Sequence, residues 1–539
     1  MERIRGKVLE IYNEQGLDAA LQDISGSQTK KRDREKCLVA LTRYAMTVNV
    51  LDAERTARAL CLESERPNMR QWAALATWDS GNIRVPYELI DALGDPELST
   101  SAVAEKIHQI RGSGKLLQKL PEIPDARPSP AYQPNSRTML YVASSSRPYH
   151  VTGYTSRTHH ILGALKASGW TTHCVTRQGY PYDRPDAREG GGELTREIDG
   201  IIYERLPGFH RRQVDYDEYL IRSACAIENA AKQLKPEIIQ AASNYEAALP
   251  ALIASRRLGI PFVYEVRGLW EYTAASKKPG WERTERFELD RRLEELVASH
   301  ADHVFTLTSA MAEELTKRGT DCDRISLAPN GIEPDAFRPL ERDQRMAADL
   351  ELADDSFVVG YVGSIVAYEG LDDLIKAVEL LVSDFPNLRL VVVGDGDVRE
   401  DLEHRVQENN LGKFVTFTGK VPPSEVTKYF SLFNVIALPR KPYQVCRLVS
   451  PLKPLEAMAM NVPMVVSDVE ALREMVTDKV SALVHKAGDP ESLADAIRLL
   501  LSDTGLAAKL AQNARSEMLP KRTWNNIAQE MIRVLERIS

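Results

Sequence analysis

The chain has 539 residues, of which 43% are hydrophobic and 27% are charged, and its formal net charge at pH 7 is −8. This length is too great for one core and predicts roughly three or four domains. The acidic balance argues against a nucleic-acid-binding protein, whose affinity comes from neutralising phosphates.

No apolar run reaches the roughly 20 residues that span a bilayer, and the N-terminus lacks the apolar core of a signal peptide. The six cysteines are scattered without Cys-x-x-Cys spacing, which favours reduced thiols over a disulfide framework or a zinc site. We therefore expect a cytoplasmic protein with at most peripheral contact with the inner face of a membrane.

Residues 1–117 are predicted to form an all-helical region, because they show little strand pattern. Two segments in it, starting at Ala40 and Ala74, resemble each other at an offset of 33 to 34 residues, with Leu60 matching Leu93. A period of about 34 residues is typical of tetratricopeptide repeats. Two copies leave a tetratricopeptide-like domain and a generic helical bundle as open interpretations. Either could bind a protein partner or the acceptor.

Residues 118–136 contain five prolines and are predicted to be a linker. Beyond it, short β-branched runs alternate with helical patterns, first from Arg137 and again from Phe357. This alternation predicts two successive doubly wound parallel sheets, with the changeover near residues 335–355. Ligands of such sheets bind beyond the carboxyl ends of the strands.

A dense group of cations occupies the sequence RKPYQVCRLVSPLKPLEAMAM, residues 440–460. It sets four basic residues against the single acid Glu456: Arg440, Lys441, Arg447 and Lys453. The segment follows a predicted buried strand, so its first half is the loop at the carboxyl end of that strand. Four cations gathered there in an acidic protein indicate an anion site, for which a diphosphate is the obvious ligand.

The second half of this stretch is predicted to start a helix. Ser450 suits the N-cap and Pro451 the first helical position, and Pro454 still falls in the first turn. The amides of Leu452 and Lys453 would then point out of the helix end, where the helix dipole favours phosphate oxygens.

Glu456 stands three residues after Lys453, on the same helical face. An ionised carboxylate only accepts hydrogen bonds, and its two oxygens could take the two hydroxyls of a ribose. Cations for a diphosphate and a carboxylate for a ribose, one helical turn apart, suit a nucleotide-sugar. The residues alone leave open the alternative of a surface helix with solvated charges.

From about Arg137 to Thr523 the chain resembles the family-4 glycosyltransferases. The pieces that carry the resemblance occur in family order: HVTGYTSRTHHILGALKASGW, FVYEVRGLWEY, LAPNGIEPDAFRP, VGYVGSIVAYEGLDDLIKAV, LRLVVVGDGDVREDLE, VTFTGKVPPSEVTKYF, PLKPLEAMAMNVPMVVSDVEALREMV and SALVHKAGDPESLADAI. The forms YEGL and SPLKPLEAMA are most similar to a branch that works on bacterial surface polysaccharides.

The resemblance implies an α/β chain of the GT-B fold, in which two Rossmann-like doubly wound domains face each other across a cleft, preceded here by the all-α region. It assigns residues 137–340 to an acceptor domain and residues 341–515 to a donor domain. Residues 516–539 would form a terminal helix that packs back on the acceptor domain.

Matched position by position, Glu456 is the glutamate that holds the donor ribose. Gly363 and Ser364 match the glycine-rich loop of the donor domain, and Gly394 lies near the nucleotide base. We expect these residues and the cationic loop to bind the donor, the full set being Gly153, Gly363, Ser364, Gly394, Arg440, Lys441, Arg447, Ser450 and Leu452.

On the acceptor side, His150, Gly153 and Tyr154 fall in the loop after the first strand, which faces the donor phosphates. We expect four residues to take part in catalysis: His150, Arg267, Lys453 and Glu456.

This sequence also departs from the family pattern. Leu448 stands where the family has a second glutamate, and Arg267 where a histidine is frequent. Ser364 and Glu369 replace the usual Arg and Lys of the first donor-domain loop. Two phosphate-binding cations are thus missing from their usual place, and the cations of residues 440–453 would restore that charge from another loop.

The resemblance implies a retaining hexosyltransferase that moves a sugar from a UDP- or GDP-linked donor to a saccharide or lipid-linked hydroxyl, in bacterial polysaccharide or glycoconjugate synthesis. No metal or other cofactor is expected. Asp395 and Asp397 form a turn sequence, not a metal-binding pair. Two alternatives stay open: a sugar-nucleotide epimerase or hydrolase on the same fold, and a non-catalytic helical-repeat scaffold with an inert transferase domain.

Overall fold

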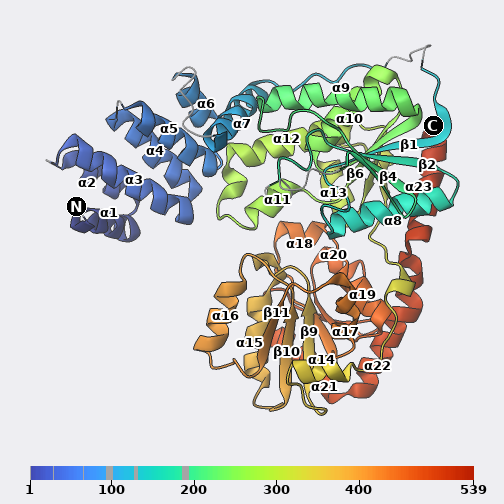
Figure 1. Cartoon of the computed structure of the whole chain (residues 1–539). Helices are drawn as coiled ribbons and strands as arrows, with labels where there is room; N and C mark the ends of the chain where they lie inside the picture. Colours follow the sequence, from blue (N-terminus) through green and yellow to red (C-terminus); the bar gives the residue numbers. More distant parts are fainter. Residues whose placement is uncertain (1, 28, 65, 93–100, 127–131, 185–192) are drawn as a thin grey trace. The chain divides into compact units, whose positions relative to one another are not determined.

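The computed structural model describes residues 2–27, 29–64, 66–92, 101–126, 132–184 and 193–539 (Figure 1). The chain divides into two compact units. The first comprises residues 1–151 and 171–304 with Ser539, and the second comprises residues 152–170 and 305–538.

The described part of the N-terminal region is helical up to residue 118, as predicted (Figure 1). Its helices are α1 (Glu2–Gln15), α2 (Leu17–Gly26), α3 (Lys31–Val48), α4 (Val50–Glu63), α5 (Pro67–Asp79), α6 (Arg84–Asp91) and α7 (Ser101–Gln118). Leu38, Leu41 and Leu60 are buried in their shared core. Neither these helices nor any other in the described ranges combine the length and the apolar content needed to cross a bilayer.

The predicted repeat falls on two consecutive helical hairpins, α3–α4 and α5–α6. Ala40 lies in α3 and Ala74 lies in α5, so the two segments begin in equivalent helices. Leu93, which the repeat aligns with Leu60, lies outside the described residues. The tetratricopeptide assignment therefore stays a prediction.

An eight-stranded sheet follows the linker, in the order β3-β4-β2-β1-β5-β6-β7-β8. Its strands are β1 (Asn135–Ala143), β2 (Thr171–Thr176), β3 (Thr195–Ile198), β4 (Ile201–Arg205), β5 (Pro236–Ala242), β6 (Phe262–Val266), β7 (His303–Thr306) and β8 (Ile325–Leu327). Strand β1 pairs in parallel with β2 and β5, as the alternating pattern predicted. The antiparallel edge strand β3 was not predicted, because its residues are polar and largely exposed.

The helices of this part are α8 (Gly153–Ala167), α9 (Tyr216–Leu234), α10 (Tyr245–Leu258), α11 (Trp270–Ala275), α12 (Glu285–His300) and α13 (Ser309–Lys317). Helices α10 and α11 each begin within a few residues of the carboxyl end of a strand, β5 and β6 respectively. Their N-terminal residues therefore lie at the edge of the sheet where ligands of such folds bind.

The second sheet has six strands in the order β11-β10-β9-β12-β13-β14, and its pairings are parallel. The strands are β9 (Phe357–Val362), β10 (Leu388–Val393), β11 (Val415–Gly419), β12 (Val435–Leu438), β13 (Met464–Ser467) and β14 (Leu483–His485). All six lie where the short apolar runs predicted them. Their side chains are largely buried, as expected of a parallel sheet covered on both faces.

The helices around the second sheet are α14 (Gln344–Asp349), α15 (Leu371–Leu381), α16 (Arg399–Glu408), α17 (Val426–Phe430), α18 (Gln444–Leu448), α19 (Lys453–Met460), α20 (Glu470–Arg473), α21 (Pro490–Ser502) and α22 (Thr504–Asn513). Two such Rossmann-like domains after an all-helical region confirm the predicted fold class (Figure 1).

The last helix, α23 (Trp524–Ile538), packs against α8. The ring of Trp524 stacks on that of His160, with 5.6 Å between the centroids. The buried guanidinium of Arg157 lies 5.7 Å from the Trp524 ring and donates a hydrogen bond of 2.7 Å to the carbonyl of Pro329. Because α23 carries its apolar residues at helical spacing, one face is free to make this contact.

Candidate active site

Loops that follow the strands β9 and β10 meet at the carboxyl edge of the second sheet. Gly363 and Gly394, the first residues after these strands, have φ angles of 145° and 135°, which side chains rarely allow. A Cβ atom on Gly394 would lie 1.9 Å from the carbonyl oxygen of Gly363, and one on Gly363 would lie 2.3 Å from Cε of Lys453. The structure therefore brings together three predicted site residues: Gly363, Gly394 and Lys453.

Ser364 is exposed at the same edge. Its backbone carbonyl accepts a hydrogen bond of 2.8 Å from the hydroxyl of Tyr361. The ring of Tyr361 also lies 5.0 Å from Nζ of Lys453. A tyrosine inside β9 thus supports the predicted donor loop and the predicted cation, a role that the apolar pattern of the strand did not reveal.

Glu369 is buried between two of the predicted cations. Its carboxylate lies 2.8 Å from Nζ of Lys453 and 3.2 Å from Nη2 of Arg440. Burial by itself raises the pKa of the Glu369 carboxyl, but attraction to Lys453 and Arg440 outweighs it and lowers the pKa to about 2. The three groups form an ionised cluster with a net charge of +1.

The other two cations of the predicted cluster form ion pairs with other acids. Lys441 lies 2.6 Å from Asp372, and the exposed Arg447 lies 2.7 Å from Glu470. The expectation that four basic residues face one acid and gather in a single group is therefore wrong. Their partner acids come from other segments of the chain, and local sequence does not reveal such contacts.

Helix α19 begins later than predicted. Its first helical residue is Lys453 and its cap residue is Leu452, so Ser450 is not the N-cap and Pro451 is not the first helical position. Ser450 is buried instead, and its carbonyl accepts a hydrogen bond of 2.7 Å from the Asn330 amide. Two prolines close together made the start of the helix ambiguous.

The predicted free amides are present. No acceptor for the backbone N–H of Leu452 or of Lys453 is found in the described ranges. The carbonyl of Leu452 already accepts from the N–H of Leu455 and of Glu456, at 2.9 and 3.2 Å. The helix therefore presents donors, its dipole and the Lys453 ammonium at one end, an arrangement that attracts anions.

Glu456 lies in the first turn of α19, partly buried. Among the described residues its carboxylate has no hydrogen-bond partner. Desolvation raises the pKa of this carboxyl to about 7, although the positive charge of Lys453 lowers it in part. When this carboxyl is ionised, both of its oxygens can accept hydrogen bonds from a ligand hydroxyl, which is the property predicted for a ribose site.

Gly153 begins the long helix α8. The cap residue Thr152 exchanges hydrogen bonds with Thr155 in a capping box. A Cβ atom on Gly153 would lie 3.5 Å from the side chain of Leu452. Tyr154 follows in the first turn of the helix. The structure thus places the N-terminus of α8 beside that of α19, so two helix dipoles converge on one region.

In the other unit, His150 is held by a buried tyrosine. Nδ1 of His150 lies 2.5 Å from the hydroxyl of Tyr180, and this hydroxyl donates its one proton to the carbonyl of Ser146 at 3.1 Å. Desolvation raises the pKa of Tyr180 to about 12, so the phenol stays protonated at neutral pH. The Tyr180 phenol therefore fixes the orientation of the His150 ring.

Arg267 belongs to a buried polar network. Its guanidinium lies 3.0 Å from the carboxylate of Glu265 and donates to the hydroxyl of Tyr141. Tyr141 in turn donates to Glu265 at 2.5 Å, and Gln240 donates to the same carboxylate at 3.1 Å. Arg267 is therefore fixed at the end of β6 by a charge pair that its sequence position alone did not predict.

Comparison with known proteins gives two family matches. Residues 152–331 match the Glycosyl transferase 4-like domain, and residues 343–517 match Glycosyl transferases group 1. The N-terminal helical region lies outside both matches.

Several characterised or named proteins are similar in sequence. An uncharacterised glycosyltransferase of Methanocaldococcus jannaschii is 28% identical, over 45% of this chain and 62% of its own length. Glycogen synthase of Mycobacterium tuberculosis is 23% identical, over 72% of this chain and 92% of its own length. D-inositol 3-phosphate glycosyltransferase of Jonesia denitrificans is 27% identical, over 70% and 89% respectively.

Solved structures share the fold. Sucrose-phosphate synthase from Thermosynechococcus elongatus aligns with a TM-score of 0.61 at 22% identity, over 74% of this chain and 98% of its own. HepE of Anabaena, solved in complex with UDP, aligns with a TM-score of 0.59 at 17% identity, over 74% and 100%. At these identities the likeness shows the architecture of the two Rossmann-like domains.

Proposed function

We infer that this chain, whose two Rossmann-like domains match glycosyltransferase families, transfers a sugar from a nucleotide diphosphate-sugar to a hydroxyl acceptor. The start of α19 carries the inference. Lys453, two backbone N–H groups without an acceptor in the described part of the chain, and the unpartnered carboxylate of Glu456 lie there within one helical turn. A diphosphate can be bound by the cation and the N–H groups, and the adjoining ribose by the carboxylate.

We propose a UDP- or GDP-linked donor. HepE, which shares the fold, was solved with UDP and with UDP-glucose. In this chain the diphosphate would meet Lys453 and the N–H groups of α19, and the ribose hydroxyls would meet Glu456. Gly363 and Gly394 would let the two loops and Lys453 pack closely together beside the nucleotide, because a Cβ atom at either position would clash with Lys453 or with the carbonyl of Gly363.

The proposed reaction breaks the bond between the anomeric carbon and the diphosphate oxygen and forms a bond from that carbon to the acceptor oxygen, with retention. The acceptor proton goes to the departing phosphate. Negative charge grows on the leaving group, and preorganised donors aimed at it contribute several kcal/mol, on the order of 3 for one donor. Neither a protein nucleophile nor a metal ion is required in this scheme.

Glu369 has a positioning role in this scheme. It holds Lys453 at 2.8 Å, so the ammonium need not be ordered when the donor binds. Arg440 donates to Glu369 and, at 2.7 Å, to the carbonyl of Val449, so it anchors the carboxylate. Lys453 is therefore the cation that we assign to the leaving group, while His150 and Arg267 belong to the acceptor side.

We place the reaction in the synthesis of a bacterial polysaccharide or glycoconjugate, with a hexosyl donor and a saccharide or lipid-linked acceptor, in the cytoplasm. Similarity to proteins named glycogen synthase and D-inositol 3-phosphate glycosyltransferase supports a saccharide or polyol hydroxyl as the acceptor class.

The proposal is tested by donor binding and turnover. UDP-glucose, UDP-galactose, UDP-N-acetylglucosamine and GDP-mannose are screened by thermal shift, since a bound ligand raises apparent stability. For the donor that binds, release of the nucleoside diphosphate is measured with and without saccharide acceptors. Release only with an acceptor supports transfer. Release without one indicates a hydrolase, and no binding of any donor indicates an inert domain; both outcomes contradict the proposal.

A further inference from the structure

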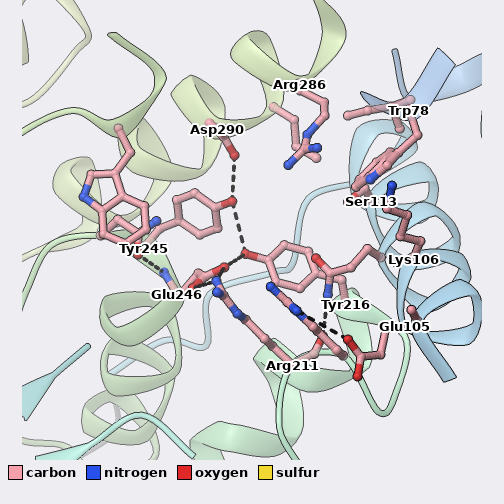
Figure 2. Close-up of a pocket in the computed structure, with 17 residues that line it drawn as sticks. Trp78, Glu105, Lys106, Ser113, Arg211, Tyr216, Tyr245, Glu246, Arg286 and Asp290 are labelled. Atoms are coloured by element: carbon pink, nitrogen blue, oxygen red, sulfur yellow. Dashed lines mark hydrogen bonds and ion pairs between the residues drawn. The ribbon is translucent and has the colours of Figure 1, made fainter. Parts of the chain in front are cut away.

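Within the first unit, a cavity of about 440 Å³ lies between the N-terminal helices and the first Rossmann-like domain (Figure 2). Trp78 at the end of α5 and Lys106 in α7 line one side of it. Tyr245 at the start of α10 and Asp290 in α12 line the other. Cavities of this size hold small molecules, and this one exists only because the helical region is present.

The helical wall of this cavity is fixed in place. His108 and Lys115, both in α7, contact the carboxylate of Asp215 at 2.9 and 2.8 Å. A Cβ atom on Gly112 would lie 2.1 Å from the backbone nitrogen of Tyr216, so α7 packs directly on the start of α9. The carboxylate of Glu285 accepts hydrogen bonds from the backbone at the start of α6, at 2.7 to 2.9 Å. These contacts hold the helical wall of the cavity against the first Rossmann-like domain.

The other wall lies where a substrate of this fold binds. Asn244 follows β5 and Trp270 follows β6, so both stand at the carboxyl ends of parallel strands. The backbone N–H of Arg267 donates to the hydroxyl of Ser243 at 3.1 Å. Arg267, which we place on the acceptor side, thus contacts the residue before Asn244 and lies three residues before Trp270.

Three cations in the cavity wall, Lys106, Arg211 and Arg212, are already paired with acids, and the fourth, Arg286, is not paired with any described acid. Arg211 makes two contacts of 2.6 to 2.7 Å with Glu246. Lys106 lies 2.8 Å from Asp79. Figure 2 shows that Glu246 contacts both Arg211 and Tyr216. A phosphate or carboxylate ligand would have to compete with these acids, so the charge pattern disfavours an anion.

Three groups remain that suit an uncharged sugar. Asp290 accepts from Tyr245 at 2.7 Å through one oxygen, and the second oxygen has no partner among the described residues. The guanidinium of Arg286 lies 4.1 Å from the ring centroid of Trp78, and no described carboxylate lies within ion-pair distance of it. The side chain of Trp270 is 45% exposed.

An aromatic face packs against the apolar side of a sugar ring, while a carboxylate accepts from its hydroxyls and a guanidinium donates to them. Desolvation raises the pKa of Asp290 to about 6, partly offset by Arg286, so the carboxylate is still mostly an acceptor at neutral pH.

We propose that this cavity binds an uncharged saccharide unit of the acceptor, away from the reacting hydroxyl, and that the N-terminal helical region supplies one wall of the site. The ligand class follows from the cavity itself, and only its role as part of the acceptor rests on the proposed function. The helical region is then a substrate-binding element of the transferase.

The test is saturation-transfer NMR on the full chain without nucleotide, with the methyl glycosides of glucose, galactose, mannose and N-acetylglucosamine as probes. Two variants remove cavity groups: Trp270→Ala, at a side chain exposed enough to leave folding intact, and Asp290→Asn, which keeps the shape. The control is Ile221→Ala, at a side chain on α9 that is 38% exposed and does not line the cavity.

We expect at least one glycoside to bind, and Trp270→Ala and Asp290→Asn to weaken it about tenfold or more, with Ile221→Ala equal to the unmodified chain. No binding of any probe, or binding that both cavity variants leave unchanged, overturns the proposal. So does competition by inorganic phosphate, which would show an anion site. UDP affinity is measured on the same samples. If UDP binds and no glycoside binds, the cavity proposal is refuted and the donor site is not. If a glycoside binds and UDP does not, the donor site is refuted and the cavity proposal is not.

Discussion

The carboxylate of Glu369 lies 2.8 Å from the ammonium of Lys453, and this contact joins the loop after β9 to the first residue of α19. The same carboxylate holds the buried Arg440. An acid, Glu369, therefore occupies a position at which the family that this chain resembles carries a cation. Here a cation is supplied instead by Lys453, at the start of α19. The local charge stays positive, although the sequence of the loop by itself indicates the reverse.

Replacing Glu369 by Gln removes the partner of two cations, one of them buried. Because the pKa of Glu369 is lowered to about 2, its ion pair contributes stability above the unfolded value near 4.5, and this contribution is lost as the pH falls toward 2. We expect Glu369→Gln to lower the free energy of unfolding by about 3 kcal/mol at pH 7 and by much less at pH 3. Urea unfolding at the two pH values measures the difference.

The matched control is Glu470→Gln. Glu470 also pairs with an arginine, Arg447, but both side chains are more than 40% exposed. Its loss is expected to cost less than about 0.5 kcal/mol. Equal costs for the two variants would show that the Glu369 cluster is not a buried structural unit.

Glu456→Gln is expected to weaken donor binding while making the free protein more stable at high pH. The pKa of Glu456 is raised to about 7, so ionising it in the folded state destabilises the fold progressively between the unfolded value near 4.5 and about 7. The free energy of unfolding of Glu456→Gln should therefore exceed that of the unmodified chain by about 1–2 kcal/mol at pH 8, and the difference should vanish at pH 4. Melting temperature against pH measures it.

Donor affinity should follow the same titration. If the ionised carboxylate accepts the ribose hydroxyls, UDP binding to the unmodified chain strengthens from pH 6 to pH 8, and Glu456→Gln shows no such rise. An unmodified affinity in the Gln variant would remove Glu456 from the nucleotide site.

Gly363→Ala tests the close approach of Lys453. The new Cβ atom would lie 2.3 Å from Cε of Lys453, at a φ of 145°. Gly319→Ala is the control, because Gly319 also has a positive φ, 94°, but nothing lies within 4 Å of its Cβ position. Both variants carry backbone strain of about 1 kcal/mol or more, and only Gly363→Ala should also weaken UDP binding, by about tenfold. Equal UDP affinities in the two variants would contradict the placement of Lys453.

Tyr180→Phe tests the role of His150. The variant removes the hydroxyl that holds Nδ1 of His150 at 2.5 Å. We expect transfer to fall about tenfold with UDP affinity unchanged, since the histidine acts on the acceptor side. Tyr182→Phe, at a neighbouring exposed tyrosine, should leave transfer unchanged. A loss of UDP affinity in Tyr180→Phe would instead indicate general damage to the fold.

The predicted strands and the all-helical beginning were found where periodicity placed them, because each strand of a parallel sheet is a short apolar run between helical patterns. Strand β3 escaped prediction since its residues, Thr195–Ile198, are polar and lie at an edge. The start of α19 was misplaced because cap chemistry favoured Ser450, whereas tertiary contacts bury that residue.

The free amides of Leu452 and Lys453 were predictable because any helix that starts near these prolines leaves its first N–H groups without an intrahelical acceptor, even though the first helical residue was misplaced. The grouping of four cations was not, since Asp372 and Glu470, which draw away Lys441 and Arg447, lie far along the chain. Charge counted along a sequence window says little about charge in space.

The account depends most directly on the binding of a nucleoside diphosphate at the start of α19. Isothermal titration of UDP and GDP into the full chain, into Lys453→Met and into Arg447→Met measures this. We predict that one nucleotide binds, that Lys453→Met weakens it about a hundredfold and that Arg447→Met changes it by less than about twofold. Binding that Lys453→Met leaves intact, or no binding of either nucleotide, would contradict the account.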